Sequence, residues 1–165
     1  MIKQEKELIG SLIQKVLDNK GFTPQWLAER IDCKRRNIYD IFKRSSLDTV
    51  KLLKISVALK TDLFKYFSEI YENTIDETMD ATPKIRYIFP IDFHVGNLIK
   101  NKLEEDGLSV IWLSKMIHCK RNNIYDILNN RASIDTERLL RICIALKVNF
   151  FVYYSDLYEN TVSQY

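Results

Sequence analysis

Two similar ten-residue segments carry the side chains with the most distinctive chemistry in this chain. They read CKRRNIYDIF at Cys33–Phe42 and CKRNNIYDIL at Cys119–Leu128, so each begins with a run of Lys, Arg and Asn after its cysteine. A guanidinium group can form paired hydrogen bonds with O6 and N7 of guanine, and a carboxamide can do so with N6 and N7 of adenine. Lysine and arginine side chains also neutralise phosphates. The chemistry open to both segments is the recognition of planar and anionic groups.

A helix over the first segment would present these polar side chains to solvent. At about 100° per residue, Ile38, Ile41 and Phe42 share one side of the helix, and that side must face the core. The outward positions and the exposed start are Arg35, Arg36, Asn37, Tyr39, Asp40 and Lys43. Asp40 could accept a hydrogen bond from a cytosine amino group or pair with Arg36 one turn earlier, and the ion pair is favoured. A solvated basic helix surface is the plain alternative for such a run.

The two segments belong to a longer repeat. A shift of 86 positions superposes Gly10 on Gly96 and Trp26 on Trp112, and brings the two segments into register. One extra residue in NNRAS, compared with KRSS, then changes the shift to 87, which aligns LDTVKLLKISVALK with IDTERLLRICIALK. About half of the aligned positions are identical. This self-similarity predicts a tandem duplication.

Each copy is predicted to contain five short helices. Apolar residues at three- and four-residue spacings predict a first helix over 6–19 and 95–105, and aromatic segments predict a fifth helix near 63–72 and 150–159. Glycines are expected to adopt the left-handed conformation after the first helix, and hydroxyl side chains to cap the second and fourth. These residues are Gly21 and Gly107, then Thr23 and Ser109, then Ser46 and Ser133.

No strand pattern recurs within a copy, so the chain is predicted to be all-α. The expected domains are residues 1–73 and 94–161, joined by a connector at 74–93 and followed by a tail at 162–165. The connector contains IRYIF at 85–89, which could form a short strand or pack across a domain.

Composition and cysteine content limit the possible classes. The chain of 165 residues is 46% hydrophobic with a net charge of +3, which indicates globular domains. It has three cysteines, charged residues in MIKQEKELIG and no apolar run of membrane-spanning length, so a soluble cytoplasmic protein without a membrane partner is expected. No Cys/His spacing suits zinc, and no Gly-rich phosphate loop or repeated nucleophile–base pair occurs. We therefore expect no metal, no cofactor and no enzymatic activity.

The stretch from Thr23 to Phe64 resembles the lambda-repressor-like (Xre-type) helix-turn-helix family, and the second copy resembles it in the same register. The matching positions in copy one are Leu27-Ala28, Ile31, Ile38, Ile41, Ser46-Leu47-Asp48-Thr49, Leu52 and Ala58-Leu59. Those in copy two are Trp112-Leu113, Ile117, Ile124, Ile127, Ser133-Ile134-Asp135-Thr136 and Ala145-Leu146. The family usually has glycine at the turn, where this chain has Asp32 and His118, two residue types that are enriched in the left-handed region.

The resemblance implies two tandem lambda-repressor-like five-helix domains and a role for the quoted segments. In this family the second helix of the motif lies in the major groove, and its first residues contact base edges. The predicted base-reading residues are Arg35, Arg36, Asn37, Asp40, Arg121, Asn122, Asn123 and Asp126. The predicted phosphate contacts are Thr23, Gln25, Lys34, Tyr39, Lys43, Arg44, Ser109, Lys120, Tyr125 and Arg131. The implied partner is double-stranded DNA.

The sequence therefore predicts a bacterial or phage transcriptional regulator, most simply a repressor, with two recognition helices in one chain. Such a pseudo-dimer would span adjacent major grooves about 34 Å apart. The difference between Arg36 and Asn122 would then give the two half-sites different base preferences.

Other arrangements remain open. Copy two has the less basic segment and could be a protein-interaction module, as in an antitoxin-like autoregulator. The aromatic fifth helices are too apolar for one face of one helix, so they could join the two copies, two chains in a homodimer, or a protein partner. Trp26 and Trp112 are expected in the core, and Cys33 and Cys119 are expected to be buried thiols.

Overall fold

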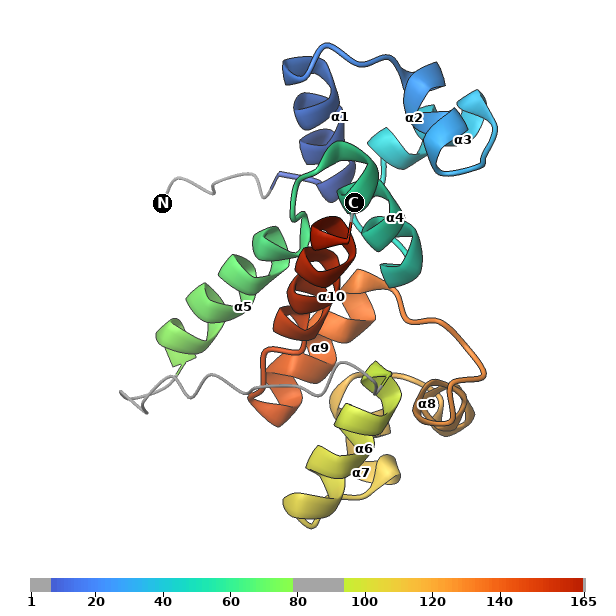
Figure 1. Cartoon of the computed structure of the whole chain (residues 1–165). Coiled ribbons are helices and arrows are strands. Elements are labelled where there is room, and N and C mark those ends of the chain that lie inside the picture. Colours follow the sequence, from blue (N-terminus) through green and yellow to red (C-terminus); the bar gives the residue numbers. More distant parts are fainter. Residues whose placement is uncertain (1–6, 79–93, 165) are drawn as a thin grey trace.

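The computed structural model describes residues 7–78 and 94–164, and these residues form ten α-helices (Figure 1). We call residues 7–78 the N-terminal half and residues 94–164 the C-terminal half. The N-terminal half contains α1 (Ile9–Asn19), α2 (Pro24–Arg30), α3 (Arg35–Phe42), α4 (Thr49–Leu59) and α5 (Phe64–Thr78). The C-terminal half contains α6 (Val95–Glu105), α7 (Val110–Met116), α8 (Arg121–Leu128), α9 (Thr136–Leu146) and α10 (Phe151–Ser163). The predicted all-α class is confirmed, while the segment at 85–89 lies outside the described residues.

The first four helices have the same lengths in the two halves: 11, 7, 8 and 11 residues. The connections among the first three helices also agree in length, whereas the one before the fourth helix is a residue longer in the C-terminal half. Gly21 and Gly107 take the left-handed conformation with φ of 72° and 65°, as predicted. The turn between the second and third helices is left-handed at Asp32 and His118, where φ is 54° and 53°.

The caps of the second helices are confirmed, whereas those of the fourth helices differ from the prediction. The Thr23 and Ser109 hydroxyls accept hydrogen bonds from the N–H groups of Trp26 and Trp112. For α4 and α9 the N-cap residues are Asp48 and Asp135. The prediction of Ser46 and Ser133 was wrong because each helix starts two residues later, where a carboxylate can accept from first-turn N–H groups. Asp48 accepts from Val50 at 3.0 Å, and Asp135 accepts from Arg138 at 2.9 Å.

Further limits of the predicted helices also shift. The first helix begins at Ile9 rather than Lys6, and α5 and α10 run on to Thr78 and Ser163. The first residues of the predicted connector are thus helical.

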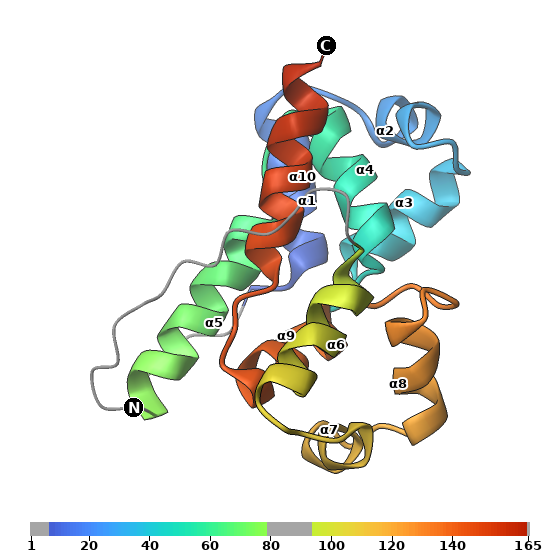
Figure 2. The same cartoon turned by 60° about the horizontal axis from the view of Figure 1, so that its bottom comes forward.

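The fifth helix of each half packs against the other half. Helix α5 lies against α9 and α10, and α10 lies against α4 and α5, as Figures 1 and 2 show from two directions. Two stacked aromatic pairs join these helices: the ring centroids of Phe64 and Tyr154 are 4.9 Å apart, and those of Phe67 and Phe151 are 5.1 Å apart. All four side chains are buried. The aromatic surplus of the sequence therefore joins the two halves within one chain.

A pair of reciprocal backbone hydrogen bonds fixes the register of the halves where α4 and α9 begin. The Thr49 N–H donates to the Ile134 carbonyl at 2.9 Å, and the Thr136 N–H donates to the Leu47 carbonyl at 2.8 Å. Asp48 and Asp135 form an isolated antiparallel bridge between them. The Thr136 hydroxyl, which is fully buried, accepts from the Leu47 N–H at 3.1 Å. Because these bonds are short and shielded, they hold the two halves in one relative position.

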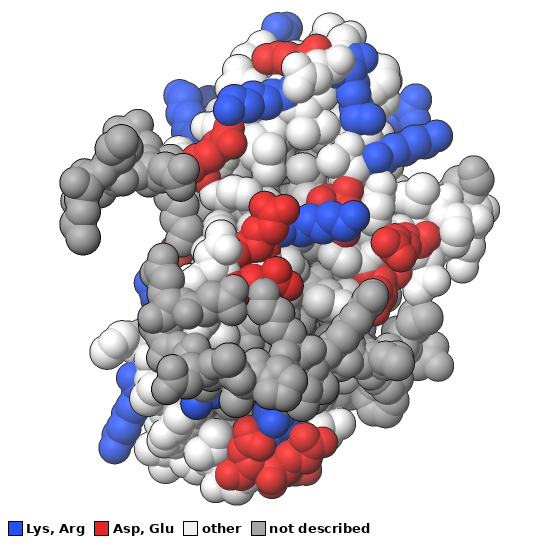
Figure 3. Space-filling view, turned by 90° about the vertical axis from the view of Figure 1, so that its left-hand side faces the viewer, with Lys and Arg blue, Asp and Glu red and all other residues white. Residues whose placement is uncertain are grey.

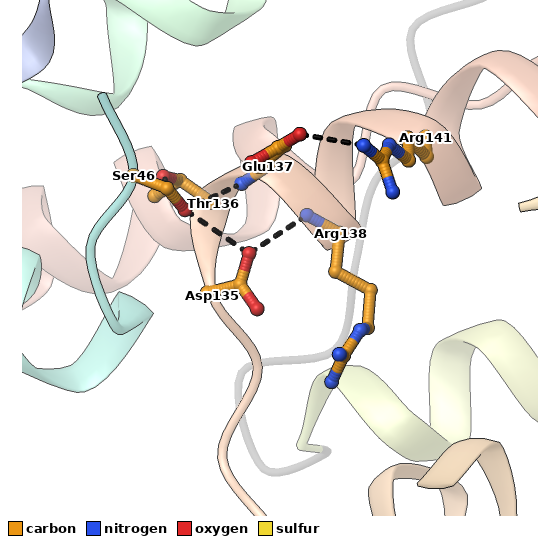
Figure 4. Close-up of polar contacts among 6 residues, drawn as sticks. All are labelled: Ser46, Asp135, Thr136, Glu137, Arg138 and Arg141. Carbon is orange, nitrogen blue, oxygen red and sulfur yellow. Dashed lines mark hydrogen bonds and ion pairs between the residues drawn. The ribbon is translucent and has the colours of Figure 1, made fainter. Parts of the chain in front are cut away.

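Ser46 strengthens this junction from one side only (Figure 4). Its hydroxyl donates to Asp135 Oδ1 at 3.0 Å and accepts from the Glu137 N–H at 3.1 Å. Ser133, which aligns with Ser46 in the sequence, is exposed. The two halves are thus joined asymmetrically despite their matching helices.

Replacing Ser46 by alanine is expected to lower the free energy of unfolding by about 1–2 kcal/mol, because two hydrogen bonds to the other half are lost. The matched change Ser133→Ala should alter it by less than about 0.5 kcal/mol, since an exposed side chain is removed. Urea unfolding followed by far-ultraviolet circular dichroism measures both. Equal effects of the two changes would contradict the asymmetric junction.

Candidate nucleic-acid interface

Helices α3 and α8 lie on the same side of the molecule. They are on the right in both Figure 1 and Figure 2, which differ by a rotation about the horizontal axis, while α5 is on the left in both. In each half the third helix packs against the first and second helices. Its apolar side is buried through Ile38 and Ile41 in α3 and through Ile124 and Ile127 in α8. The remaining side of each helix is free to meet a common partner.

A glycine in the first helix lets each third helix approach closely. A Cβ at Gly10 would lie 2.2 Å from the Ile41 carbonyl oxygen, and one at Gly96 would lie 2.3 Å from the Ile127 carbonyl oxygen. Gly10 also donates its N–H to the Arg44 carbonyl at 3.0 Å, just after α3. Any larger residue would push the end of the third helix outward. The sequence shows that the two glycines align, but only the structure shows that they allow the first and third helices to approach closely.

The N-termini of α3 and α8 carry positive potential. Lys34 and Lys120 are the N-cap residues, and neither helix has a side-chain cap hydrogen bond. The N–H groups of the first turn therefore keep the partial positive charge of the helix dipole, and lysine and arginine side chains add to it. Such an end suits a phosphate oxygen.

The predicted base-reading residues all lie on α3 or α8, and the structure brings each set of four to one helix surface. Seven of them are exposed and Asp126 is half-buried. Arg35 donates to the Tyr39 hydroxyl at 3.0 Å, and its guanidinium lies 5.6 Å from the centre of that ring. Within the described ranges, 7–78 and 94–164, Arg36 and Asp40 form no ion pair, so the favoured pairing was wrong. The contact at a four-residue spacing is instead the one between Arg35 and Tyr39, and the Arg36 side chain is exposed.

The ten predicted phosphate contacts are all exposed. Tyr39 and Tyr125 correspond in the two helices and are exposed by 42% and 44%. Gln25 donates to Glu29 at 2.8 Å on the surface of α2. Its counterpart in α7 is Ile111, an apolar side chain that is 46% exposed. The C-terminal half thus lacks one polar group at the edge of its candidate surface.

The opposite side of the molecule has mixed charge. Acidic and basic side chains are interspersed over the face in Figure 3, which views the molecule from the left of Figure 1. A DNA backbone would meet carboxylates there. On and beside α3, five exposed cations accompany two exposed carboxylates: Lys34, Arg35, Arg36, Lys43 and Arg44, with Asp32 and Asp40. This excess of positive charge makes the side of α3 the better surface for a polyanion.

The pattern of an exposed third helix packed against the first and second helices agrees with a comparison to known families. A Cro/C1-type HTH DNA-binding domain is found at residues 99–150. The match includes α7, α8 and α9 and covers just under a third of the chain. It lies in the half that the sequence made the weaker candidate for DNA binding. The chain has no significant match among the curated proteins or the solved structures compared with it.

Several other sequence predictions can be placed in the structure. Cys33 and Cys119 are half-buried rather than buried, whereas Cys143 is fully buried in α9, where loss of solvation raises the pKa of its thiol to about 12. Trp26 and Trp112 are half-buried and pack against the core. In the described part of the chain, no group of three His, Cys, Asp or Glu side chains could hold a metal ion. None of the described helices is long and apolar enough to cross a membrane.

The changes Gly10→Ala and Gly96→Ala are each expected to lower the free energy of unfolding by about 2–3 kcal/mol, because the added methyl group overlaps a backbone carbonyl. Ser11→Ala, at the next position of α1, is the control and should change it by less than about 0.5 kcal/mol. Urea unfolding measures all three. Stabilisation by Gly10→Ala, as expected from helix propensity alone, would refute the close approach of α1 and α3.

Proposed function

We propose that this protein is a sequence-specific DNA-binding transcriptional regulator that uses α3 and α8 as two recognition helices. The observation that carries the proposal is that α3 and α8 lie on the same side of the molecule, with Arg and Asn side chains exposed at the start of both helices. The Cro/C1-type domain at residues 99–150 supports DNA binding by α8. The repeated segment and equal helix lengths extend this function to α3, as expected for a tandem duplication.

In the proposed complex, each third helix enters the major groove with its N-terminus first. Lys34 and Lys120 neutralise phosphates at the groove edge, and the open first-turn N–H groups donate hydrogen bonds to a phosphate oxygen. Arg36 and Asn122 then reach base edges, since both are exposed. The hydrogen bond from Arg35 to Tyr39 holds that guanidinium along the helix surface, where it contacts the backbone or an adjacent base.

The two half-sites are proposed to differ. Arg36 favours guanine and Asn122 favours adenine, while Arg35 and Arg121 are alike in the two helices. Because the reciprocal bonds between the halves fix the position of α3 relative to α8, one chain would read a bipartite site of constant spacing. Repression by occupying a promoter, in the cytoplasm of a bacterium or of a phage host, is the simplest outcome.

A second candidate function is protein binding by the C-terminal half, as in an antitoxin-like autoregulator. One observation favours it: Ile111 and Met116 on α7 are exposed by 46% and 52%, where α2 has Gln25 and Arg30. The fifth helices are not a free surface for this partner, since most of their aromatic residues are buried and two stacked pairs join the halves. The site would instead lie on α7.

Selection of bound fragments from genomic or random DNA tests the proposal. We expect a bipartite motif with the full chain. Arg35→Ala with Arg36→Ala should erase one half of the motif, and Arg121→Ala with Asn122→Ala the other, each weakening binding at least tenfold because every bidentate pair supplies about 1–3 kcal/mol.

Lys65→Ala, on the distant α5, is the control and should leave affinity within about twofold. If only the first pair of changes matters, the C-terminal half does not read DNA, and protein binding through α7 becomes the better proposal. If no motif is enriched, sequence-specific binding is wrong.

Exchanging the two differing residues tests their role directly. The combined changes Arg36→Asn and Asn122→Arg should swap the preferred bases between the half-sites without changing their spacing. Fluorescence anisotropy with the original and exchanged DNA sites measures this. An unchanged preference would show that neither residue reads bases.

A further inference from the structure

A groove of about 610 Å³ lies where the end of α10 meets α2 and α4. Its apolar floor comes from α4 and α10: Leu53, Val57, Ala58 and Val162. Three cations stand around it: Arg30, Lys54 and Lys60. Its volume is within the usual range of small-molecule sites, which are mostly apolar with a few convergent polar groups.

The three cations are available to a ligand. Arg30 lies with its guanidinium 4.9 Å from the centre of the Trp26 ring, a contact that restrains the side chain without neutralising its charge. Lys54 is exposed, and the residue one turn earlier in its helix is Val50. Lys60 follows α4 in the left-handed conformation, with φ of 49°. Among the described residues, no ion pair joins any of the three to a carboxylate.

The C-terminal half does not repeat this arrangement. Met116 aligns with Arg30, so one of the three charges is missing. Arg141 aligns with Lys54 but donates to Glu137 at 2.6 Å, because Glu137 takes the place of Val50. Among the described residues, three cations without carboxylate partners therefore line this groove, and the aligned positions of the C-terminal half do not repeat the set.

We propose that this groove binds a small amphipathic carboxylate, with the acidic group between Arg30 and Lys54 and the apolar body against Val57, Ala58 and Val162. Two cations that line one groove can give charge-assisted hydrogen bonds to a carboxylate, and the apolar floor excludes water from its chain. A neutral molecule would leave the cations unpaired, and an inorganic anion would leave the apolar floor wet. The ligand class follows from both requirements together.

The ligand contacts both halves of the chain. Val57 and Lys54 belong to α4, whereas Thr161 and Val162 belong to α10 of the C-terminal half. Binding therefore strengthens the packing of α10 on α4 and stabilises the joined state of the halves. If the proposed function holds, the carboxylate is also an effector of DNA binding, but its binding can be measured without DNA.

The test uses sodium decanoate as the probe and decan-1-ol, which has the same chain length without the charge, as the comparison. Isothermal titration calorimetry on the full chain should show one decanoate site and at least tenfold weaker binding of the alcohol. A hundredfold excess of decanoate over its Kd should raise the melting temperature by roughly 5–10 °C, as expected for a ligand that binds only the folded state.

Variants locate the site. Arg30→Gln with Lys54→Gln should weaken decanoate binding at least tenfold, whereas a control that removes the same charge from the C-terminal half, Arg141→Gln with Lys147→Gln, should leave it within twofold. Val57→Trp should abolish binding by filling the groove, and its own melting temperature shows whether it folds. Equal losses in the two charge variants would overturn the proposal. The proposal would also be overturned if the full chain bound no decanoate and the Arg30 and Lys54 variant bound DNA more weakly. These two cations would then be phosphate contacts.

Discussion

The exchange of fifth helices between the two halves is the constraint on which the rest of the structure depends. Phe64 stacks on Tyr154 and Phe67 on Phe151, so neither α5 nor α10 can leave its place without exposing two buried rings. The reciprocal hydrogen bonds of Thr49 and Thr136 then fix the register at the start of α4 and α9. Burial of the large rings stabilises the packing of the two halves, and the backbone hydrogen bonds fix their relative orientation. Together they set the positions of α3 and α8 relative to each other.

Within each half, the exposed third helix is positioned by close backbone contact rather than by large side chains. The absence of a Cβ at Gly10 and Gly96 allows the first helix to touch the carbonyl groups of Ile41 and Ile127. An interior at crystalline packing density transmits small shifts, so a single methyl group at either glycine would displace the exposed third helix. This contact links the core to the position of that helix in both halves.

The halves share a scaffold but differ where they meet solvent. Arg36 against Asn122, Gln25 against Ile111 and Arg30 against Met116 are all changes of exposed or groove-lining residues, while the buried positions of the helices correspond. A packed core tolerates few changes, whereas surface positions can change with little loss of stability. The differences therefore fall where binding partners can be distinguished.

The sequence alone determined the all-α class, the presence of five helices in each half, the caps at Thr23 and Ser109, and the exposure of Arg36 and Asn122, because these depend on residues within about one helical turn. It misplaced the caps of α4 and α9 and wrongly paired Arg36 with Asp40, since several local contacts compete there. Only the tertiary structure decided that α5 and α10 are exchanged, that Ser46 binds Asp135 while Ser133 stays exposed, and that Arg30 and Lys54 line one groove with Val162. Those contacts join residues far apart in the chain, and periodicity within one segment contains no information about which distant surface will cover it.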